Sequence, residues 1–123
     1  MTLPGARVVV TRAEHQAGGL VAAFEAAGAQ VEVLPLLEIV PPTDRTPLEQ
    51  ALREISEYDR LVFTSTNAVE EFLPFAGDLA PRVQIAVVGP ATADAVRAYE
   101  IEPHLTAHRG DAEGLLVDLL ERI

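Results

Sequence analysis

Residues 60–69 read RLVFTSTNAV, and this stretch decides how the chain is expected to fold. The apolar run Leu61 to Phe63 passes directly into small hydroxyl and amide side chains, and a helical pattern follows. Such side chains accept hydrogen bonds from the unpaired amides of a helix's first turn, so a strand that ends in them is typically followed by a helix. The stretch predicts a strand at Arg60–Thr64 and a helix at Ala68–Phe75.

The same alternation continues on both sides of this stretch. Apolar runs predict further strands at Arg7–Thr11, Gln30–Val40, Val83–Val88 and Glu102–Thr106. Amphipathic runs predict further helices at Glu14–Ala27, Leu48–Ser56, Pro90–Tyr99 and Asp111–Ile123. In the last helix, the four leucines at 115, 116, 119 and 120 are expected to face inward. Gly28 stands where a left-handed residue would end the first helix, and Pro35 should place the second strand at an edge or end it.

Five β-α units in 123 residues predict an α/β fold with a parallel sheet. Because crossovers are right-handed, the expected architecture is a single flavodoxin-like (βα)5 domain over residues 1–123, with helices on both faces of a five-stranded sheet in the order 2-1-3-4-5. That order puts Pro35 on an edge strand, where a residue without an amide hydrogen is tolerated.

Composition excludes several classes of function. The net charge is −10, and all nine basic residues are arginine, so a general nucleic-acid surface is not expected. Cysteine is absent and the three histidines are scattered, so neither a disulfide nor a metal site is expected. No run approaches the roughly 20 apolar residues of a membrane span, and the N-terminus lacks the pattern of a signal peptide. The chain is therefore expected to be soluble and cytoplasmic.

No cofactor motif is present. The sequence has no Walker phosphate loop, no G-x-G-x-x-G after the first strand and no G-x-S-x-G elbow. None of its six aromatic residues falls at a predicted strand end where it would stack on a flavin. No cofactor is expected. Aspartates such as Asp44 and Asp111 lie in loops or at helix starts, where they are expected to act as caps.

Polar residues cluster where the predicted strands end. Parallel sheets bind ligands beyond the carboxyl ends of their strands, where helix N-termini attract carboxylate or phosphate groups. The residues expected at this edge are Thr11, Arg12, Gln16, Ser65, Asn67, Gly89 and Thr92. A simpler interpretation stays open, in which Ser65, Asn67 and Thr92 only cap helices and Arg12 pairs with Glu14.

Four stretches carry a family resemblance. They read VVVTRAEHQAGGLVAAFEAAGAQVEVLPLLEI, YDRLVFTSTNAVEEF, IAVVGPATADAV and DAEGLLVDLL. In order and spacing they resemble the N-terminal half of uroporphyrinogen-III synthase, over nearly all of the chain. The sequence departs from the family at Glu100, where relatives usually have a helix-ending glycine.

The resemblance implies an enzyme of heme biosynthesis that closes hydroxymethylbilane into uroporphyrinogen III without a cofactor. The family binds this polycarboxylate tetrapyrrole through backbone amides and small hydroxyl side chains at strand ends. The matching motifs then imply substrate contacts at Ser65, Asn67, Ala68, Val69, Gly89 and Thr92. Thr11, Arg12 and Gln16 belong to the first motif.

The family's full length is about twice that of this chain, and its second half supplies a tyrosine that Tyr58 and Tyr99 do not match. The resemblance therefore implies half of a synthase, with little or no activity alone. A truncated or engineered non-catalytic scaffold is the alternative. Residues 1–30 would form the first β-α unit, 31–46 a former crossover segment and 47–123 the remaining units. The chain is expected to fold back into one monomeric domain, and a homodimer that exchanges residues 1–30 is the alternative.

Overall fold

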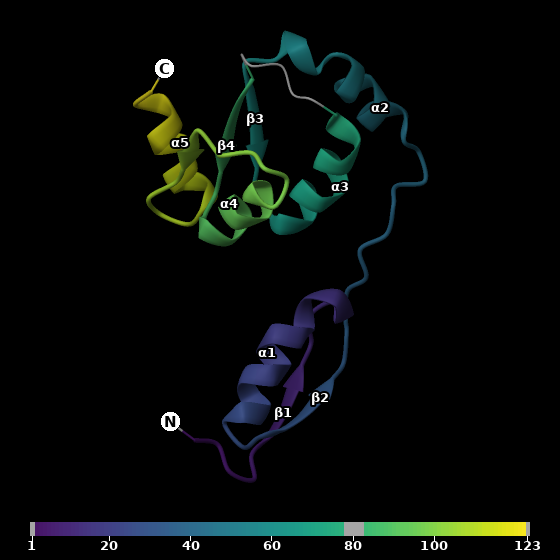
Figure 1. The fold of residues 1–123 in the computed structure, drawn as a ribbon, viewed down its shortest axis with the longest axis vertical. Coiled ribbons are helices and arrows are strands. Elements are labelled where there is room, and N and C mark those ends of the chain that lie inside the picture. The colour runs from purple at the N-terminus through teal and green to yellow at the C-terminus, as the bar shows by residue number, and fades with distance from the viewer. Residues whose placement is uncertain (1, 78–82, 123) are drawn as a thin grey trace. The chain divides into compact units, whose positions relative to one another are not determined.

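The computed structural model describes residues 2–77 and 83–122, which divide into two compact units (Figure 1). The first unit is Met1–Pro41 and the second is Pro42–Ile123. Both are built from parallel strands and helices. The prediction of an α/β fold with parallel strands is therefore confirmed.

The first unit consists of β1 (Arg7–Val10), α1 (Glu14–Ala26) and β2 (Gln30–Val33). The two strands pair in parallel, and α1 packs against them (Figure 1). Gly28 ends the helix in the left-handed region with φ 92°, as predicted. β2 ends before Pro35, so the predicted strand Gln30–Val40 was too long by residues 34–40, and its end before the proline agrees with the expectation that Pro35 limits it.

The second unit has a three-stranded parallel sheet in the order β3-β4-β5. Its strands are β3 (Arg60–Phe63), β4 (Gln84–Val87) and β5 (Leu105–Thr106). Its helices are α2 (Thr46–Arg53), α3 (Thr66–Ala76), α4 (Pro90–Arg97) and α5 (Ala112–Leu120), with a short 3₁₀ turn at Ile55–Glu57. The predicted helix at 111–123 includes residue 123, which lies outside the described residues.

Helices cover the two faces of this sheet unequally. Phe63, Ile85 and Val87 project from one face into a core shared with α3 and α4. On the other face, Ala86 and Leu105 pack against Leu115 of α5. On that second face the β3 residue Val62 stays 44% exposed. One face is therefore fully packed, and the other is covered over β4 and β5 but not over β3.

The single five-stranded sheet is not confirmed. The predicted neighbours 2-1, 3-4 and 4-5 are present and parallel, but the described strands form two sheets and β1 does not pair with β3. Residues 34–45 between the units contain no helix or strand. Prolines at 35, 41 and 42 remove three amide donors from this segment, although the amides of Leu34 and Leu36 still donate to the carbonyls of Val10 and Thr11.

The prediction that four leucines of the last helix face inward was half wrong. Leu115 is buried and Leu119 packs beside it, whereas Leu116 and Leu120 are exposed. The last two lie on the flank of α5, where the second unit has no further helix among the described residues to cover them.

Glu100, where the resemblance led us to expect a glycine, adopts a left-handed conformation with φ 61°. Its amide donates to the carbonyl of Arg97 at 2.9 Å, so the helix ends here without the residue best suited to this backbone. Glu100→Gly is expected to raise the free energy of unfolding by about 1 kcal/mol, because glycine has no Cβ to strain. Urea unfolding tests this, with Glu121→Gly at the end of α5 (φ −69°) as the control that should not be stabilised.

Candidate functional site

The carboxyl ends of β3, β4 and β5 lie side by side in the second unit. The amide of Val88 donates to the carbonyl of Phe63 at 3.2 Å, and the amide of Ala107 donates to the carbonyl of Val87 at 3.0 Å. The residues that follow the three strands therefore form one rim, at which α3, α4 and α5 all begin. We call this the carboxyl rim, comprising residues 64–69, 88–92 and 107–111.

Ser65 caps α3 at this rim. Its Oγ accepts a hydrogen bond from the amide of Ala68 at 3.1 Å, and its carbonyl accepts one from the amide of Val69 at 3.4 Å. The capping interpretation of Ser65 is thus confirmed. The amides of Ala68 and Val69 are already used inside the first turn, and the Val69 side chain is fully buried. A ligand at this position would have to share or replace these hydrogen bonds.

Gly89 and Thr92 lie at the start of α4. Gly89 precedes the helix in an extended conformation, Pro90 occupies the first helical position, and no side chain caps this helix. Thr92 is 4% exposed and belongs to the buried face of α4, so it is not the cap of this helix. This N-terminus therefore depends on backbone groups alone, which suits an anion better than a side-chain cap would.

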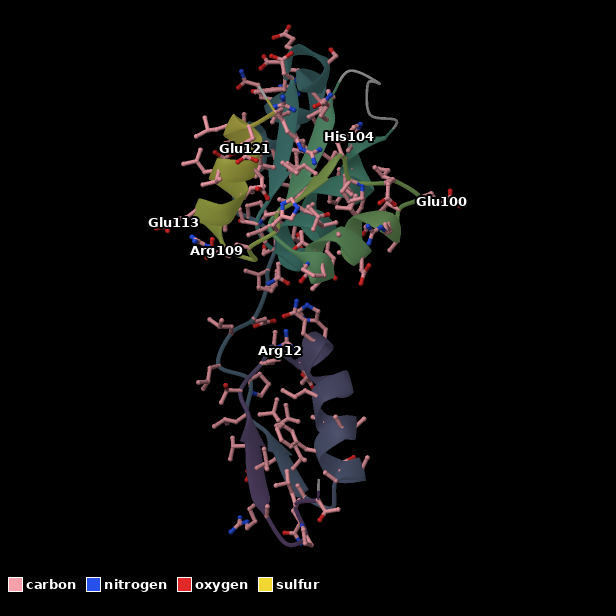
Figure 2. All side chains as sticks on the ribbon, turned by 90° about the vertical axis from the view of Figure 1, so that its left-hand side faces the viewer. Arg12, Glu100, His104, Arg109, Glu113 and Glu121 are labelled. Carbon is pink, nitrogen blue, oxygen red and sulfur yellow. The ribbon has the colours of Figure 1, made fainter. Side chains whose placement is uncertain are left out.

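The structure brings Ser65, Asn67, Ala68, Val69, Gly89 and Thr92 to the carboxyl rim. The remaining predicted site residues, Thr11, Arg12 and Gln16, belong to the first unit and follow β1 (Figure 2 labels Arg12). A groove of about 820 Å³ lies beside them, lined by Ala13, Glu14, His15 and residues 35–39. Glu14 and Glu38 on its walls repel carboxylates, so this groove is poorly suited to a polycarboxylate.

The third segment of the rim, His108 to Asp111, was not among the site residues predicted from the sequence. Asp111 was expected to cap a helix, and its Oδ1 accepts from the amide of Gly114 at 2.7 Å. Arg109 pairs with Asp111 at 2.8 Å and with Glu113 at 3.1 Å. Figure 2 labels Arg109 and Glu113. His108 contacts Asp118 of α5. Only the Asp111 cap had a signal in the sequence, because His108 and Asp118 meet through the fold.

Asp118 is the most buried carboxylate of the described residues. One oxygen, Oδ2, accepts from the His108 amide at 2.7 Å and lies 3.0 Å from His108 Nδ1. The hydrogen bond from this amide, followed by the one from the ring, lowers the pKa of Asp118 below the ordinary value of 3.8. Asp118 is therefore ionised at neutral pH, and it fastens the loop after β5 to α5.

Asp118→Asn is expected to flatten the loss of stability in acid. A carboxyl whose folded pKa is lowered adds stability above its unfolded pKa, and this is lost as the pH falls through the folded value. The wild type should lose unfolding temperature steeply below about pH 4, and the variant less so. Thermal melts across this pH range measure the difference. Asp94→Asn, which removes the exposed ion pair between Asp94 and Arg97, is the control. Parallel curves for wild type and Asp118→Asn would contradict the assignment.

None of the described helices is long and apolar enough to cross a membrane. Within ranges 2–77 and 83–122, no three His, Asp or Glu side chains are placed to hold a metal ion.

Sequence comparison places this fold among known proteins. A sequence model described as uroporphyrinogen-III synthase HemD matches residues 18–123. The uroporphyrinogen-III synthase of Synechococcus elongatus is 43% identical over 68 residues, which are 55% of this chain and 26% of that protein. The porphyrin biosynthesis protein HemD of Ruminiclostridium josui is 29% identical over 125 residues, covering 97% of this chain and 25% of that one.

Solved structures agree. A mutant uroporphyrinogen III synthase from Thermus thermophilus matches with a TM-score of 0.65 and 27% identity, over 98% of this chain and 51% of that chain. The Helicobacter pylori uroporphyrinogen-III synthetase shares the fold, with a TM-score of 0.60 at 17% identity over 95% and 54% of the two chains. The chain thus spans about a quarter of these two curated relatives and about half of these solved structures. By the match over residues 18–123, the chain belongs to the uroporphyrinogen-III synthase family.

Proposed function

We propose that this chain supplies the N-terminal part of a uroporphyrinogen-III synthase, a lyase of heme biosynthesis that cyclises hydroxymethylbilane. Its carboxyl rim binds acetate and propionate groups of the linear tetrapyrrole. The observation that carries the proposal is the convergence of the N-termini of α3, α4 and α5 on one rim, in a chain of this family. Helix N-termini offer amide donors and positive potential to carboxylates, which an acidic protein otherwise lacks.

The individual residues have different roles in this proposal. Ser65 and Asn67 offer side chains at the start of α3, and Ala68 and Val69 offer amides that now bond within the first turn. Gly89 lets a carboxylate approach the uncapped N-terminus of α4, and Thr92 lies on the buried side of the first turn of that helix. Thr11, Arg12 and Gln16, which follow β1 in the first unit, are proposed to contact substrate carboxylates outside the acidic groove of that unit. The reaction then depends on positioning and charge stabilisation, and no cofactor takes part.

The arrangement of the two units has two candidate solutions. Among the described strands, β1 and β3 each pair on one side only. The first unit of the same chain could complete the sheet at β3 and give the predicted single domain in the order 2-1-3-4-5. Alternatively, two copies exchange this unit. We favour the single domain, because residues 34–45 are long and irregular enough to turn back. Light scattering should report the mass of one chain, and a two-chain mass would favour exchange.

Product analysis tests the catalytic part. Purified chain is incubated with hydroxymethylbilane, and uroporphyrinogen III is separated from the type I isomer that forms without an enzyme. Little type III product is expected from the chain alone, and more when the remainder of a family member is added as a separate polypeptide. Ser65→Ala and Asn67→Ala should reduce the restored activity, whereas Glu57→Gln, away from the rim, should not. No type III product under either condition would favour a non-catalytic scaffold domain.

Binding separates the scaffold alternative from an inactive half. A half synthase should bind uroporphyrinogen III, the cyclic product, without converting the linear substrate. A scaffold domain should bind neither.

A cytoplasmic location remains part of the proposal, because hydroxymethylbilane would have to be available where the chain resides.

A further inference from the structure

His108 stands at the carboxyl rim in an unusual setting for an exposed histidine. It follows Ala107, whose amide pairs with the end of β4, so the residue is fixed to the rim by the sheet itself. Its side chain is 85% exposed, whereas the Asp118 side chain that holds it is 12% exposed. An ordinary exposed histidine has no buried carboxylate beside its ring to fix its orientation. Here one ring edge is anchored to a buried carboxylate and the other is in solvent.

The geometry determines which nitrogen is presented to a ligand. Nδ1 lies 3.0 Å from Asp118 Oδ2, and the same oxygen accepts from the backbone amide of His108 at 2.7 Å. An ionised carboxylate accepts hydrogen bonds only, so the hydrogen on this side of the ring is carried by Nδ1. Nε2 lies on the opposite, exposed edge. When both ring nitrogens carry hydrogen, the ring can donate to Asp118 and to a ligand carboxylate at once.

The neighbouring charges leave this role to His108. Arg109 is the other cation of the segment, and its guanidinium already pairs with Asp111 and Glu113. Arg122 lies near Asp118 and donates to the carbonyl of His104 at 3.5 Å. His104 is at the other end of β5, as its separation from Arg109 in Figure 2 illustrates, and its Nδ1 accepts from the amide of Ile85.

The loop that carries His108 also touches the loop after β4. A Cβ placed on Gly89 would lie 3.9 Å from Gly110 Cα, and one placed on Gly110 would lie 4.0 Å from the Val88 carbonyl oxygen. The uncapped start of α4 and the His108 segment are therefore adjacent. A carboxylate at the start of α4 can have a second carboxylate of the same molecule beside it on the His108 side.

From these contacts we infer that His108, positioned by Asp118, is a further substrate-binding residue, which donates from Nε2 to a carboxylate of the tetrapyrrole. This inference rests on the proposed function. It adds a cationic ligand to a rim whose other cation among the described residues, Arg109, already pairs with Asp111 and Glu113. His108 contacts the substrate, and Asp118 acts through it.

Nitrogen-15 NMR of the intact chain tests the inference and the proposed function separately. Uroporphyrinogen III, kept reduced, is added while the backbone amides and the histidine ring nitrogens are followed. Shifts at the amides of residues 65–69 and 89, together with a change of His108 Nε2 toward the protonated form, would support both. Shifts at the amides without a change in the His108 ring would overturn the inference alone. No change at either place would remove the proposed function as well. The His104 ring serves as the internal control.

Two substitutions separate binding from folding. His108→Asn retains a side-chain amide near the position of Nδ1 that can donate to Asp118, but it has no outer nitrogen. Its dissociation constant for uroporphyrinogen III should rise roughly fivefold to tenfold, the effect of losing one charge-assisted hydrogen bond at an exposed site. Its urea midpoint should stay close to that of the wild type. Arg109→Gln should change the dissociation constant less. A larger loss in Arg109→Gln than in His108→Asn would overturn the assignment.

Asp118→Asn tests whether Asp118 positions the His108 ring and sets its tautomer. The asparagine oxygen can still accept from the His108 amide, but its charge is gone. The variant should fold and should show a changed Nδ1 to Nε2 tautomer ratio for His108 in the NMR spectrum, with weaker binding. An unchanged ratio would show that Asp118 only fastens the loop.

Discussion

Phe63→Ala is expected to lower the free energy of unfolding of the second unit by about 3–5 kcal/mol. Phe63 ends β3, is 2% exposed, and packs in the core between the sheet and α3 and α4. Its ring meets that of Phe72 edge to face with 5.9 Å between centroids, and the substitution removes this ring pair as well as the buried apolar area. Alanine would leave a cavity lined by side chains that are anchored on three elements and cannot all move inward.

Phe75→Ala is the matched control for this substitution. Phe75 belongs to α3 in the same unit, but its side chain is 51% exposed. Among the described residues, its ring has one ring contact, with the Arg45 guanidinium 4.6 Å from the ring centroid. Its loss should cost under about 1 kcal/mol. Urea unfolding monitored by circular dichroism measures both variants. Equal effects of the two substitutions would show that the core is not where the structure places it.

Gly114→Ala is expected to destabilise the chain by about 2 kcal/mol, although alanine normally favours a helix. A Cβ on Gly114 would lie 2.6 Å from the carbonyl oxygen of Arg109 and 2.7 Å from its Cβ. Neither atom is the far end of a flexible side chain, so the turn before α5 has to move. That movement would also disturb the Asp111 cap, whose Oδ1 accepts from the Gly114 amide.

Gly18→Ala in α1 supplies the opposite expectation. Nothing among the described residues lies within 4 Å of a Cβ built at Gly18, so only the helix preference remains. This variant should be neutral or should gain about 0.5–1 kcal/mol. Thermal and urea unfolding of the two variants give the comparison directly. A stabilised Gly114→Ala protein would mean that the loop of Arg109 does not press on α5 in solution.

The local pattern was sufficient to predict the parallel strands and the helices between them. The run into TSTNAV predicted β3 from its apolar side chains, and it predicted the Ser65 cap and α3 because hydrogen bonding within a few residues determines those two. The same local chemistry placed the left-handed Gly28 and the end of β2 before Pro35. Features that depend on neighbours in sequence were thus readable from the chain.

Features that depend on neighbours in space were not readable. Leu116 and Leu120 have the periodicity of buried residues, but periodicity does not say whether a covering element is present. Thr92 was considered as a helix cap, but α4 begins at Pro90 with Gly89 at the capping position. Thr92 therefore lies inside the first turn, where it is buried. His108 and Asp118 are ten residues apart, on a loop and a helix, and no spacing rule connects them.

The sheet of the second unit has unequal edges. β5 is a two-residue strand that offers almost no ladder to an incoming chain, whereas β3 offers four residues with Val62 exposed beside them. Short edge strands protect against aggregation, and lysine, a common guard of longer edges, is absent from this sequence. If the first unit does not cover β3, pairing between copies is therefore expected at β3 rather than at β5.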